Sequence, residues 1–570
     1  MITQPAPPIW VPHRRRDPAL AQEIARELEM PLPMAHVLVN RGIGSAEAAR
    51  RFLESSIEDL HDPFQLLGLD RAVARVRRAI ETGERIRVHG DYDVDGITAT
   101  FVLYSALQRL GARAEYYIPH RTRDGYGLTR EGMEDAHRRG VGLVVTVDCG
   151  ITAHPAVERG RALGVDVVIT DHHAPSADLP GARAVVNPLR PGCPYPFKAL
   201  AGVGVAFKLA DALLRGDGGP AGARDFHDVV ALGTIADVVP LVGENRVLAR
   251  LGLEQLNRGR RIGLEALMEV AGLAGRRITS SQVAFALAPR INAAGRMGNA
   301  ERGLELLLAR ERGEARAIAA DLDDDNQRRR RYDEEALAEA GRQIETELGW
   351  PECRSILLWS DRWHAGVIGI VASRLVERYQ RPAVLVALDG EVGRGSGRSL
   401  PGLDLNELLG HCSDLLEGYG GHAFAAGLTV ARARLPELRS RLETLVSERL
   451  GPEDCLPQLA IDAELPLGEC DAPLVDWLER MTPYGLENPE PLFRTGQVMV
   501  ESATAVGGGK HLRLRVRDAT GSAEAIGFGL GDRVREIAAA RACELACVPM
   551  REQWMGEARI QLKVKGVRVP

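Results

Sequence analysis

The sequence predicts an α/β protein of several domains, with a mostly parallel sheet in its first half and a small β-barrel at its C-terminus. Short apolar runs alternate with amphipathic helical stretches from about residue 86 to residue 241, which is typical of a parallel α/β sheet. Strands with period-two alternation follow from about residue 461. Because the chain has 570 residues, we expect three to four domains, each with its own core.

The first α/β region shows its elements in regular order, after a small helical segment before about residue 60. Its helices end at Gly111, Gly140 and Gly164, since glycine commonly closes a helix. The expected strands are Ile86–His89, Ala114–Ile118, Leu143–Val147, Val165–Thr170 and Ala184–Val186, and the expected helices are Ile97–Leu110, Thr129–Arg139 and Ala153–Leu163.

A long solvated helix is expected from about 313 to 348, where Ala, Glu, Arg and Leu dominate and Pro and Gly are almost absent. A second α/β pattern follows, with strands at Ser355–Trp359 and Ala383–Ala387 around a helix at Val367–Tyr379. Near the C-terminus, His511–Arg517 and Arg559–Lys565 alternate basic and apolar residues. The expected segments are therefore 1–60, 61–312, 313–350, 351–455 and 456–570.

The composition excludes several classes of protein. With 45% hydrophobic and 26% charged residues, the chain is neither largely disordered nor fibrous. It shows no membrane-spanning run and no signal core, so we expect a cytoplasmic protein without a membrane partner. The eight cysteines form no C-x-x-C pair, which argues against a disulfide framework or a zinc ribbon. The 72 basic and 78 acidic residues exclude a simple polycation, so any nucleic-acid contact must come from local patches.

The strongest chemical signal lies directly after the first predicted strand. There His89, Asp91, Asp93 and Asp95 stand within seven residues, in a segment that we expect to be a loop before the next helix. The carboxyl end of a strand is where open α/β sheets bind ligands. Carboxylates this close repel one another unless cations neutralise them, which indicates a metal site. The alternative is a solvated acidic turn that caps the helix.

The next two strands repeat the pattern at the same edge of the sheet. Asp148 follows the strand at Leu143–Val147, and Asp171, His172 and His173 follow the strand at Val165–Thr170. One such residue is usually a cap or a satisfied polar group, but three consecutive strand ends with mixed imidazole and carboxylate ligands favour a metal centre. Asp237 is a further candidate, because it stands in an otherwise apolar segment where a carboxylate needs a partner.

The ordered set His89, Asp93, Asp95, Asp148, Asp171, His172, His173 and Asp237 resembles the DHH phosphoesterases, and within them the RecJ family. The likeness extends from about residue 40 to residue 570. It is supported by the segments Asp124–Leu128, Pro289–Arg296, His364–Gly369 and Gly420–Gly427. The resemblance implies a DHH catalytic domain at 61–312, a DHH-associated domain at 351–455 and an OB-fold that binds single strands at 456–570.

The resemblance also implies two divalent cations, with Mn²⁺ expected and Mg²⁺ able to substitute. One cation would be held by His89, Asp93 and Asp148, and the other by Asp95, Asp148, His172 and Asp237, so that Asp148 bridges them. Asp171 would orient a neighbouring imidazole, and His173 would face the scissile phosphate. Two cations in such a site activate water and stabilise the charge that develops on the phosphate.

Candidate contacts to the DNA lie outside this cluster. Charged donors and unhindered amides favour phosphate, which points to Arg290, Asn292, Arg296, Ser396 and Arg398. His422 is a further candidate, since its Gly- and Ala-rich segment lets the backbone approach a substrate closely and the resemblance places this segment across the cleft from the metals. Without the family, the segment Gly393–Ser399 is as well explained by a flexible turn, and His422 by a core histidine. In the barrel, the basic face could equally be the solvent side of two strands; its members are Arg513, Arg515, Arg517, Lys563 and Lys565.

The activity implied by the resemblance is hydrolysis of single-stranded DNA from its 5′ end to mononucleotides, in DNA repair and recombination. A helicase and a single-strand-binding protein are possible protein partners. Two rivals stay open: a DHH phosphodiesterase for short oligonucleotides or cyclic dinucleotides, and a non-catalytic replication scaffold of the Cdc45 type. An additional barrel argues against the first rival, and intact candidate ligands argue against the second.

Overall fold

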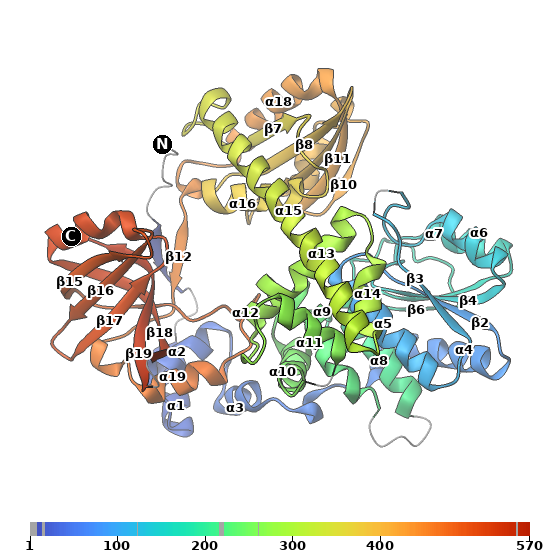
Figure 1. Ribbon diagram of the computed structural model, residues 1–570, viewed down its shortest axis with the longest axis horizontal. Coiled ribbons are helices and arrows are strands. Elements are labelled where there is room, and N and C mark those ends of the chain that lie inside the picture. The colour runs from blue at the N-terminus through green and yellow to red at the C-terminus, as the bar shows by residue number, and fades with distance from the viewer. Residues whose placement is uncertain (1–7, 14–16, 122, 216–221, 260, 555–556) are drawn as a thin grey trace. The chain divides into compact units, whose positions relative to one another are not determined.

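The computed structural model describes residues 8–13, 17–121, 123–215, 222–259, 261–554 and 557–570 (Figure 1). These residues form two compact units. Unit 1 holds residues 8–11 and 324–459, and unit 2 holds the remainder, namely 12–323 and 460–570. The division falls inside the 36-residue helix α15 (Arg312–Glu347), at the place where the sequence predicts a long helix.

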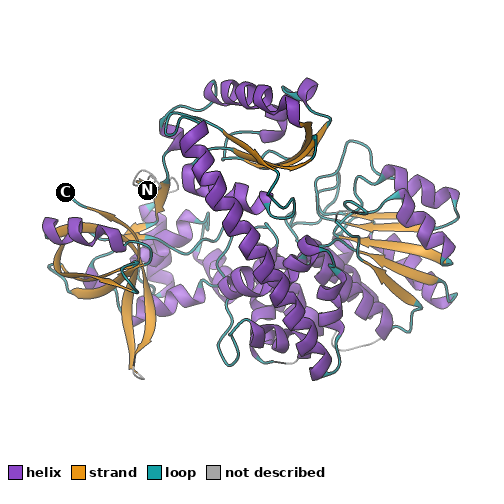
Figure 2. Ribbon diagram, turned by 45° about the horizontal axis from the view of Figure 1, so that its top comes forward, coloured by secondary structure: helices purple, strands orange, loops and turns teal. Residues whose placement is uncertain are grey.

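The first sheet of unit 2 is fully parallel, with the strand order β3-β2-β4-β5-β6. Its strands are Ala114–Tyr117 (β3), Arg85–His89 (β2), Val141–Val147 (β4), Asp166–Thr170 (β5) and Ala184–Val186 (β6). Helices α4 (Leu69–Glu81), α5 (Val94–Arg109) and α8 (Gly202–Arg215) share one apolar core with the sheet, and α6 (Arg130–Arg138) and α7 (His154–Ala162) share another (Figure 2). The predicted α/β class is confirmed.

One boundary differs from the expectation in a way that matters for the site. Helix α5 begins at Val94, three residues earlier than expected, because the Asp93 carboxylate accepts a hydrogen bond from the Gly96 amide and caps the helix. Asp95 therefore lies in the first helical turn and not in a loop. The remaining helices of this region are α9 (His227–Ala236), α10 (Gly243–Asn257), α11 (Ile262–Val270), α12 (Ser280–Gln282), α13 (Ala288–Met297) and α14 (Glu301–Leu308).

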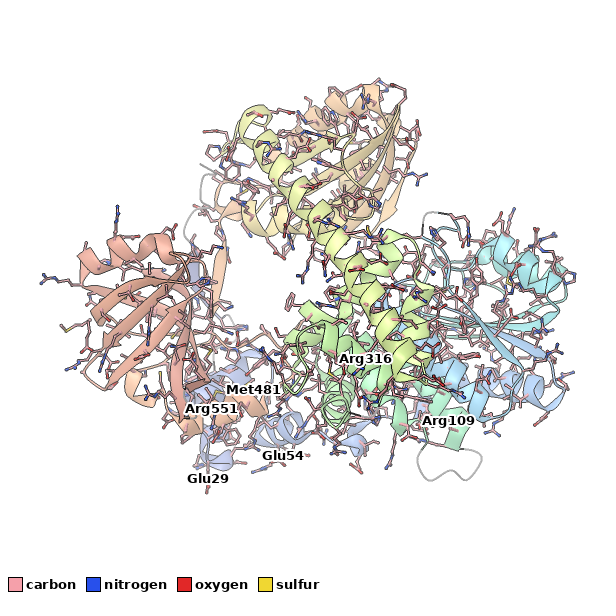
Figure 3. All side chains as sticks on the ribbon, viewed as in Figure 1. Glu29, Glu54, Arg109, Arg316, Met481 and Arg551 are labelled. Carbon is pink, nitrogen blue, oxygen red and sulfur yellow. The ribbon has the colours of Figure 1, made fainter. Side chains whose placement is uncertain are left out.

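The N-terminal helices pack against a segment that lies more than four hundred residues later in the chain. They are α1 (Pro18–Leu28), α2 (Leu32–Asn40) and α3 (Ala46–Glu54). Met34 and Leu38 share a core with Leu474 and Leu478 of α19 (Ala472–Arg480). The buried Arg246 guanidinium donates to the backbone carbonyl of Met481 at 2.8 Å. Met481 is labelled in Figure 3. Contacts of the N-terminal helices with α19, and of Arg246 with the residue after α19, thus join the N-terminal and C-terminal parts of unit 2.

Unit 1 contains a five-stranded sheet in the order β10-β11-β9-β8-β7, in which only β7 and β8 are parallel. The strands are Ile356–Ser360 (β7), Ala383–Asp389 (β8), Val392–Arg398 (β9), Gly418–Gly421 (β10) and Ala425–Ala431 (β11), and the helices are α16 (Ile368–Tyr379), α17 (Leu405–Gly410) and α18 (Leu435–Ser447). Strand β1 (Ile9–Pro12) pairs with β12 (Gln458–Ile461) in a separate two-stranded sheet.

The C-terminal strands close into a barrel, which confirms the prediction. Strand β18 (Ala542–Trp554) pairs with β15 (Val498–Val506) and with β19 (Glu557–Arg568), while β16 (His511–Arg517) and β17 (Ser522–Gly527) complete the circle. Strands β13 (Ala463–Glu464) and β14 (Phe493–Arg494) extend the sheet beside β18, and helix α20 (Val534–Ala540) precedes β18 in the chain. All eight cysteines are free thiols. Among the described residues, no helix combines the length and apolar character that a membrane span needs.

Candidate metal centre

The loop from β2 into α5 brings the first carboxylates to the carboxyl edge of the parallel sheet. Asp93 caps α5, and Asp95 in the first turn is buried. Both oxygens of Asp95 accept hydrogen bonds from the first amides of α8, from Gly202 at 2.7 Å and from Val203 at 2.8 Å. Because a helix N-terminus stabilises negative charge, these two amides favour the ionised carboxylate, although burial and the neighbouring carboxylates outweigh them and raise its pKa, and they hold the side chain in one orientation.

Asp148 follows β4 in a backbone conformation that side chains seldom adopt, with φ of 60°. Its amide donates to the Thr170 carbonyl of β5 at 3.1 Å, and the Tyr126 hydroxyl donates to its carbonyl at 3.4 Å. A Cβ atom on Gly202 would lie only 2.4 Å from the Asp148 Oδ1 atom. The strained turn and the glycine together let the Asp148 carboxylate reach the middle of the cluster.

The residues after β5 add imidazole to the carboxylates. The His172 Nε2 atom lies 3.1 Å from Asp148 Oδ1 and 3.8 Å from both Asp95 Oδ2 and Asp237 Oδ2. Asp171 is turned differently, since its carboxylate accepts hydrogen bonds from the Ile151 and His172 amides and from His173 Nδ1 at 2.7 Å. His172 therefore faces the other carboxylates, while Asp171 orients His173.

Among the described residues, the candidate ligands form three groups, and within each group the ligand atoms lie within 4.8 Å of one another. Asp148 and His172 each belong to two of them, and of the two only the carboxylate has two oxygen atoms with which to bridge a pair of cations. The groups are Asp91 with Asp93 and Asp148, Asp95 with His172 and Asp237, and Asp148 with His172 and His173.

The electrostatics show why this cluster suits cations. Burial, followed by repulsion from Asp93, raises the pKa of Asp91 to about 8, and burial with neighbouring carboxylates also raises the pKa of Asp95 and Asp148. The Oδ1 atoms of Asp91 and Asp148 and the Oδ2 atom of Asp237 are buried without a hydrogen-bond partner. Divalent cations would neutralise the carboxylates and satisfy these atoms, so the donor set fits Mn²⁺ or Mg²⁺.

His89 is the one expected ligand that lies outside the three groups of the described residues, although its Nδ1 atom is buried without a hydrogen-bond partner. Its Nε2 atom lies 3.2 Å from the Gly127 carbonyl, its ring stacks on Tyr117, and its Cε1 atom lies against Gly132 of α6. Burial lowers the pKa of this imidazole to about 4, so it packs as a neutral ring. Asp91 takes its place in the group with Asp93 and Asp148. Asp91 could have been predicted as a ligand from the sequence, because it belongs to a run of alternating carboxylates, Asp91, Asp93 and Asp95.

Two further expectations near the cluster need correction or addition. Asp237 is not inside a buried apolar run: it ends α9, its side chain is partly exposed, and the next residue, Val238, is 85% exposed. Tyr126 had no assigned role in the sequence, yet its hydroxyl lies 3.3 Å from His173 Nδ1. Burial alone would lower the pKa of His173, but the hydrogen bond that its Nδ1 atom donates to Asp171 raises the pKa to about 9, which favours the protonated imidazole while no cation is bound.

Helix α13 stands beside the acidic loop, but its residues do not all face a substrate. The Asn292 side chain accepts a hydrogen bond from the Val94 amide at 3.1 Å and so supports the start of α5. Arg290 is buried, with its Nε atom 2.8 Å from Asp323 Oδ1 and its Nη1 atom donating to the Ala286 carbonyl. These two contacts serve the fold, and the expectation that Arg290 also binds phosphate stays a prediction. Arg296 is partly exposed and remains a candidate.

Ser396 and Arg398 come together in unit 1, although not on a flexible loop. They lie on strand β9, where Gly393, Gly395 and Gly397 face Val386, Leu428 and Leu405 too closely for a Cβ atom. The opposite face then presents Arg394, Ser396 and Arg398, and Arg398 Nη1 lies 3.3 Å from Ser396 Oγ. His422 is exposed in the turn before β11, whose first residue pairs with Arg398. Ser396, Arg398 and His422 thus share one end of this sheet.

The basic residues of β16 lie on the exposed face of the barrel as expected. Acidic neighbours form ion pairs with them, so the net positive charge of this face is small. Arg513 pairs with Glu524 at 3.0 Å, and Glu501 pairs with both Arg515 and Arg517. Lys563 is half-buried and pairs with Glu490, whereas Lys565 is exposed. The alternation of β16 was thus predicted correctly, while the compensating carboxylates come from other strands and from a loop.

Three family models match separate parts of the chain. The model described as DHH family, N-terminal domain, matches residues 85–234, the DHHA1 domain matches residues 354–448, and the RecJ OB domain matches residues 461–566.

Full-length relatives agree with these matches. The chain is 37% identical to the single-stranded-DNA-specific exonuclease RecJ of Bacillus subtilis over 98% of this chain and 70% of the relative. It is 36% identical to the protein of the same name from Salmonella typhimurium over 97% and 98% of the two chains. A crystal structure of RecJ from Thermus thermophilus with Mn²⁺ superposes with a TM-score of 0.85 and 34% identity, covering 99% of this chain and 80% of that one. The form with Mg²⁺ gives 0.79 and 33%, over 99% and 78% of the two chains.

Proposed function

The chain belongs to the RecJ family of single-stranded-DNA-specific exonucleases, and we propose that it degrades single-stranded DNA from the 5′ end to mononucleotides. It is a metal-dependent exonuclease with a DHH domain, a DHHA1 domain and an OB domain. The observation that carries the chemistry is the cluster of buried carboxylates around His172 at the carboxyl edge of the sheet. The direction of digestion and the product are the parts that need testing.

The geometry supports a revised set of ligands. One divalent cation would be held by Asp91, Asp93 and Asp148, and a second by Asp95, Asp148, His172 and Asp237. When bound, the two cations lower the pKa of a water nucleophile and stabilise negative charge on the phosphate oxygens. RecJ of Thermus thermophilus has been crystallised with Mn²⁺ and with Mg²⁺, which supports either metal here.

The neighbouring side chains would bind and orient the DNA. His173, whose Nδ1 atom donates to Asp171, offers its Nε2 atom in the protonated form as a donor to a phosphate oxygen, and the Tyr126 hydroxyl lies against the same Nδ1 atom. Arg296 in unit 2 and Ser396, Arg398 and His422 in unit 1 are the proposed contacts to the sugar-phosphate backbone. Arg290 and Asn292 keep α13 and α5 in position.

Oligonucleotides with a 5′ or a 3′ label test this function. With Mn²⁺, linear single-stranded DNA should yield mononucleotides from its 5′ end, whereas blunt duplexes, closed single-stranded circles and samples with chelator should stay intact. Degradation of the circle would show an endonuclease, and loss of the 3′ label first would reverse the proposed direction. An intact linear strand with cleaved cyclic dinucleotides would favour the short-substrate phosphodiesterase.

Reversing charge on the barrel should weaken the binding of long strands. For Arg513→Glu with Arg515→Glu and Lys563→Glu, the slope of log K against log salt should fall by about 0.7 for each DNA phosphate that the barrel no longer neutralises. Hydrolysis of very short oligonucleotides should change little, because they end before the barrel. Arg551→Glu is the control, since this exposed arginine of β18 pairs with Asp476 of α19 and lies off the β16 face. Equal losses on short and long strands would argue against a binding role of the barrel.

A helicase or a single-strand-binding protein would supply the substrate, because the proposed reaction needs a free single-stranded end that duplex DNA does not offer. Because the chain belongs to a family of DNA-degrading enzymes, we also propose that it acts on cellular DNA in the cytoplasm, in repair and recombination.

A further inference from the structure

An exposed phenylalanine lies on the helix that supports the acidic loop. Residues 280–297 form one helical stretch, in which Val283–Leu287 is a π-helical turn between α12 and α13. Val283 and Leu287 are buried, but the Phe285 side chain between them is 76% exposed. Large aromatic side chains are normally buried, so a ring in water at this position needs a reason.

The turn that presents Phe285 has a local cause and a buried anchor. Pro289 lies four residues after Phe285; it has no amide hydrogen, and its ring would clash with the Phe285 carbonyl in a regular α-helix. The chain widens to a π-turn instead. Arg290 then donates to the Ala286 carbonyl at 2.7 Å while its Nε atom is bound to Asp323. The exposure of Phe285 is therefore fixed by the fold.

The same helix connects Phe285 to the metal centre. Asn292 binds the Val94 amide at the start of α5, and a Cβ atom on Gly295 would lie 2.5 Å from the Tyr92 carbonyl. Phe285 precedes Asn292 by seven residues, which is about 10 Å along a helix. The π-turn also packs against α9, which ends just before Asp237 and the exposed Val238. Exposed apolar surface thus lies next to Asp237 at Val238, and Phe285 lies on the helix that contacts the start of α5 through Asn292.

We propose that Phe285 stacks on a nucleobase of the single strand while a nearby phosphate is held at the metal centre. This inference rests on the proposed function. Unpaired bases present flat apolar faces, and an aromatic ring binds them regardless of sequence. Bases in a duplex are paired and already stacked, so they offer no such face to Phe285. The ring would therefore add to the preference for single strands. Such a contact matters here because carboxylates partly neutralise the basic face of the barrel.

Fluorescence of 2-aminopurine, placed at successive positions from the 5′ end, measures this contact in the full-length protein. Binding is followed with Ca²⁺ and with chelator, and the same proteins are assayed for nucleotide release with Mn²⁺. One or two positions should be quenched by the wild type. Phe285→Ala should lose that quenching and bind the strand about tenfold more weakly, whereas Phe285→Trp should keep both. Phe64→Ala, at another exposed phenylalanine of unit 2, should behave as the wild type.

An abasic site at the quenched position separates stacking from a structural role. With that oligonucleotide, the wild type and Phe285→Ala should bind equally, because the partner of the ring is gone. A persistent difference, or quenching that Phe285→Ala retains, would overturn the proposal and leave a protein partner as the explanation for the ring. If the wild type released no nucleotides with Mn²⁺ but still quenched 2-aminopurine, the proposed function would fail while the stacking contact stood.

Discussion

Asp148→Asn is expected to lower the rate of nucleotide release about 10³-fold, which corresponds to roughly 4 kcal/mol of lost transition-state stabilisation. Asp148 belongs to the group with Asp91 and Asp93 and also contacts His172. The substitution therefore weakens both proposed cation sites at once. Asparagine also tolerates the left-handed backbone that Asp148 adopts, so the turn after β4 should keep its shape.

The same variant should be at least as stable as the wild type when no metal is present. Burial and neighbouring carboxylates raise the folded-state pKa of Asp148, so the ionised form opposes folding at neutral pH. The neutral amide removes this repulsion, and it also removes the gain on adding Mn²⁺. Thermal unfolding with Mn²⁺ and with chelator measures both effects.

Asp178→Asn is the matched control for this variant, because Asp178 is exposed and lies in the loop after the same strand end as His173. It should leave activity and the metal-dependent rise in melting temperature unchanged. A folded Asp148→Asn protein that degrades DNA at a near-normal rate with Mn²⁺ would show that Asp148 does not serve both cations.

The positions of the strand ends could be read from the sequence because they depend on local patterns. Apolar runs of four to seven residues mark the strands of a buried parallel sheet, and the polar residue after each run must lie at its carboxyl edge. Asp148, His172 and the acidic run after His89 were located in this way, and the structure brings Asp148, His172, Asp93 and Asp95 together. The alternation of β16 was equally local.

The direction of individual side chains could not be read in the same way. His89 is the last residue of β2 and Asp91 lies two positions later, so the spacing alone does not say which of them faces the cluster. The choice is made by packing, since Tyr117 and Gly132 enclose the His89 ring. The contacts of Arg290 within the fold could not be predicted for a similar reason: its partner Asp323 lies on another helix, and no local pattern indicates the pair.

Glycines gave a second source of error, because they fit both loops and tightly packed strands. Gly393, Gly395 and Gly397 suggest a phosphate-binding turn, yet their period of two puts all three on the packed face of β9. Gly202 carried no signal at all in the sequence. Its importance depends on Asp148, more than fifty residues earlier, and on the amide that it gives to Asp95.

Gly202→Ala should therefore impair the enzyme far more than an alanine in a helix usually does. The new Cβ atom would lie 2.4 Å from Asp148 Oδ1 and 2.7 Å from the Asp148 Cβ and Cγ atoms. Since these atoms are close to the backbone, a rotation of the side chain cannot relieve the clash. Asp148 or the start of α8 must move, and a shift of α8 would also displace the amides of Gly202 and Val203 that hold Asp95.

Both proposed cation sites would be distorted, so we expect a loss of about 10²-fold in nucleotide release and a weaker response of the melting temperature to Mn²⁺. Gly204→Ala is the control: it makes the same change one half-turn further along α8, where the new Cβ atom lies farther from its neighbours, 3.3 Å from Leu200 Cδ2 and 3.6 Å from Leu200 Cβ. The control should fold and work normally. If Gly202→Ala bound Mn²⁺ and digested DNA like Gly204→Ala, the close packing of α8 against Asp148 would have no part in building the metal centre. If both variants lost activity equally, the cause would be a general intolerance of α8 and not the contact with Asp148.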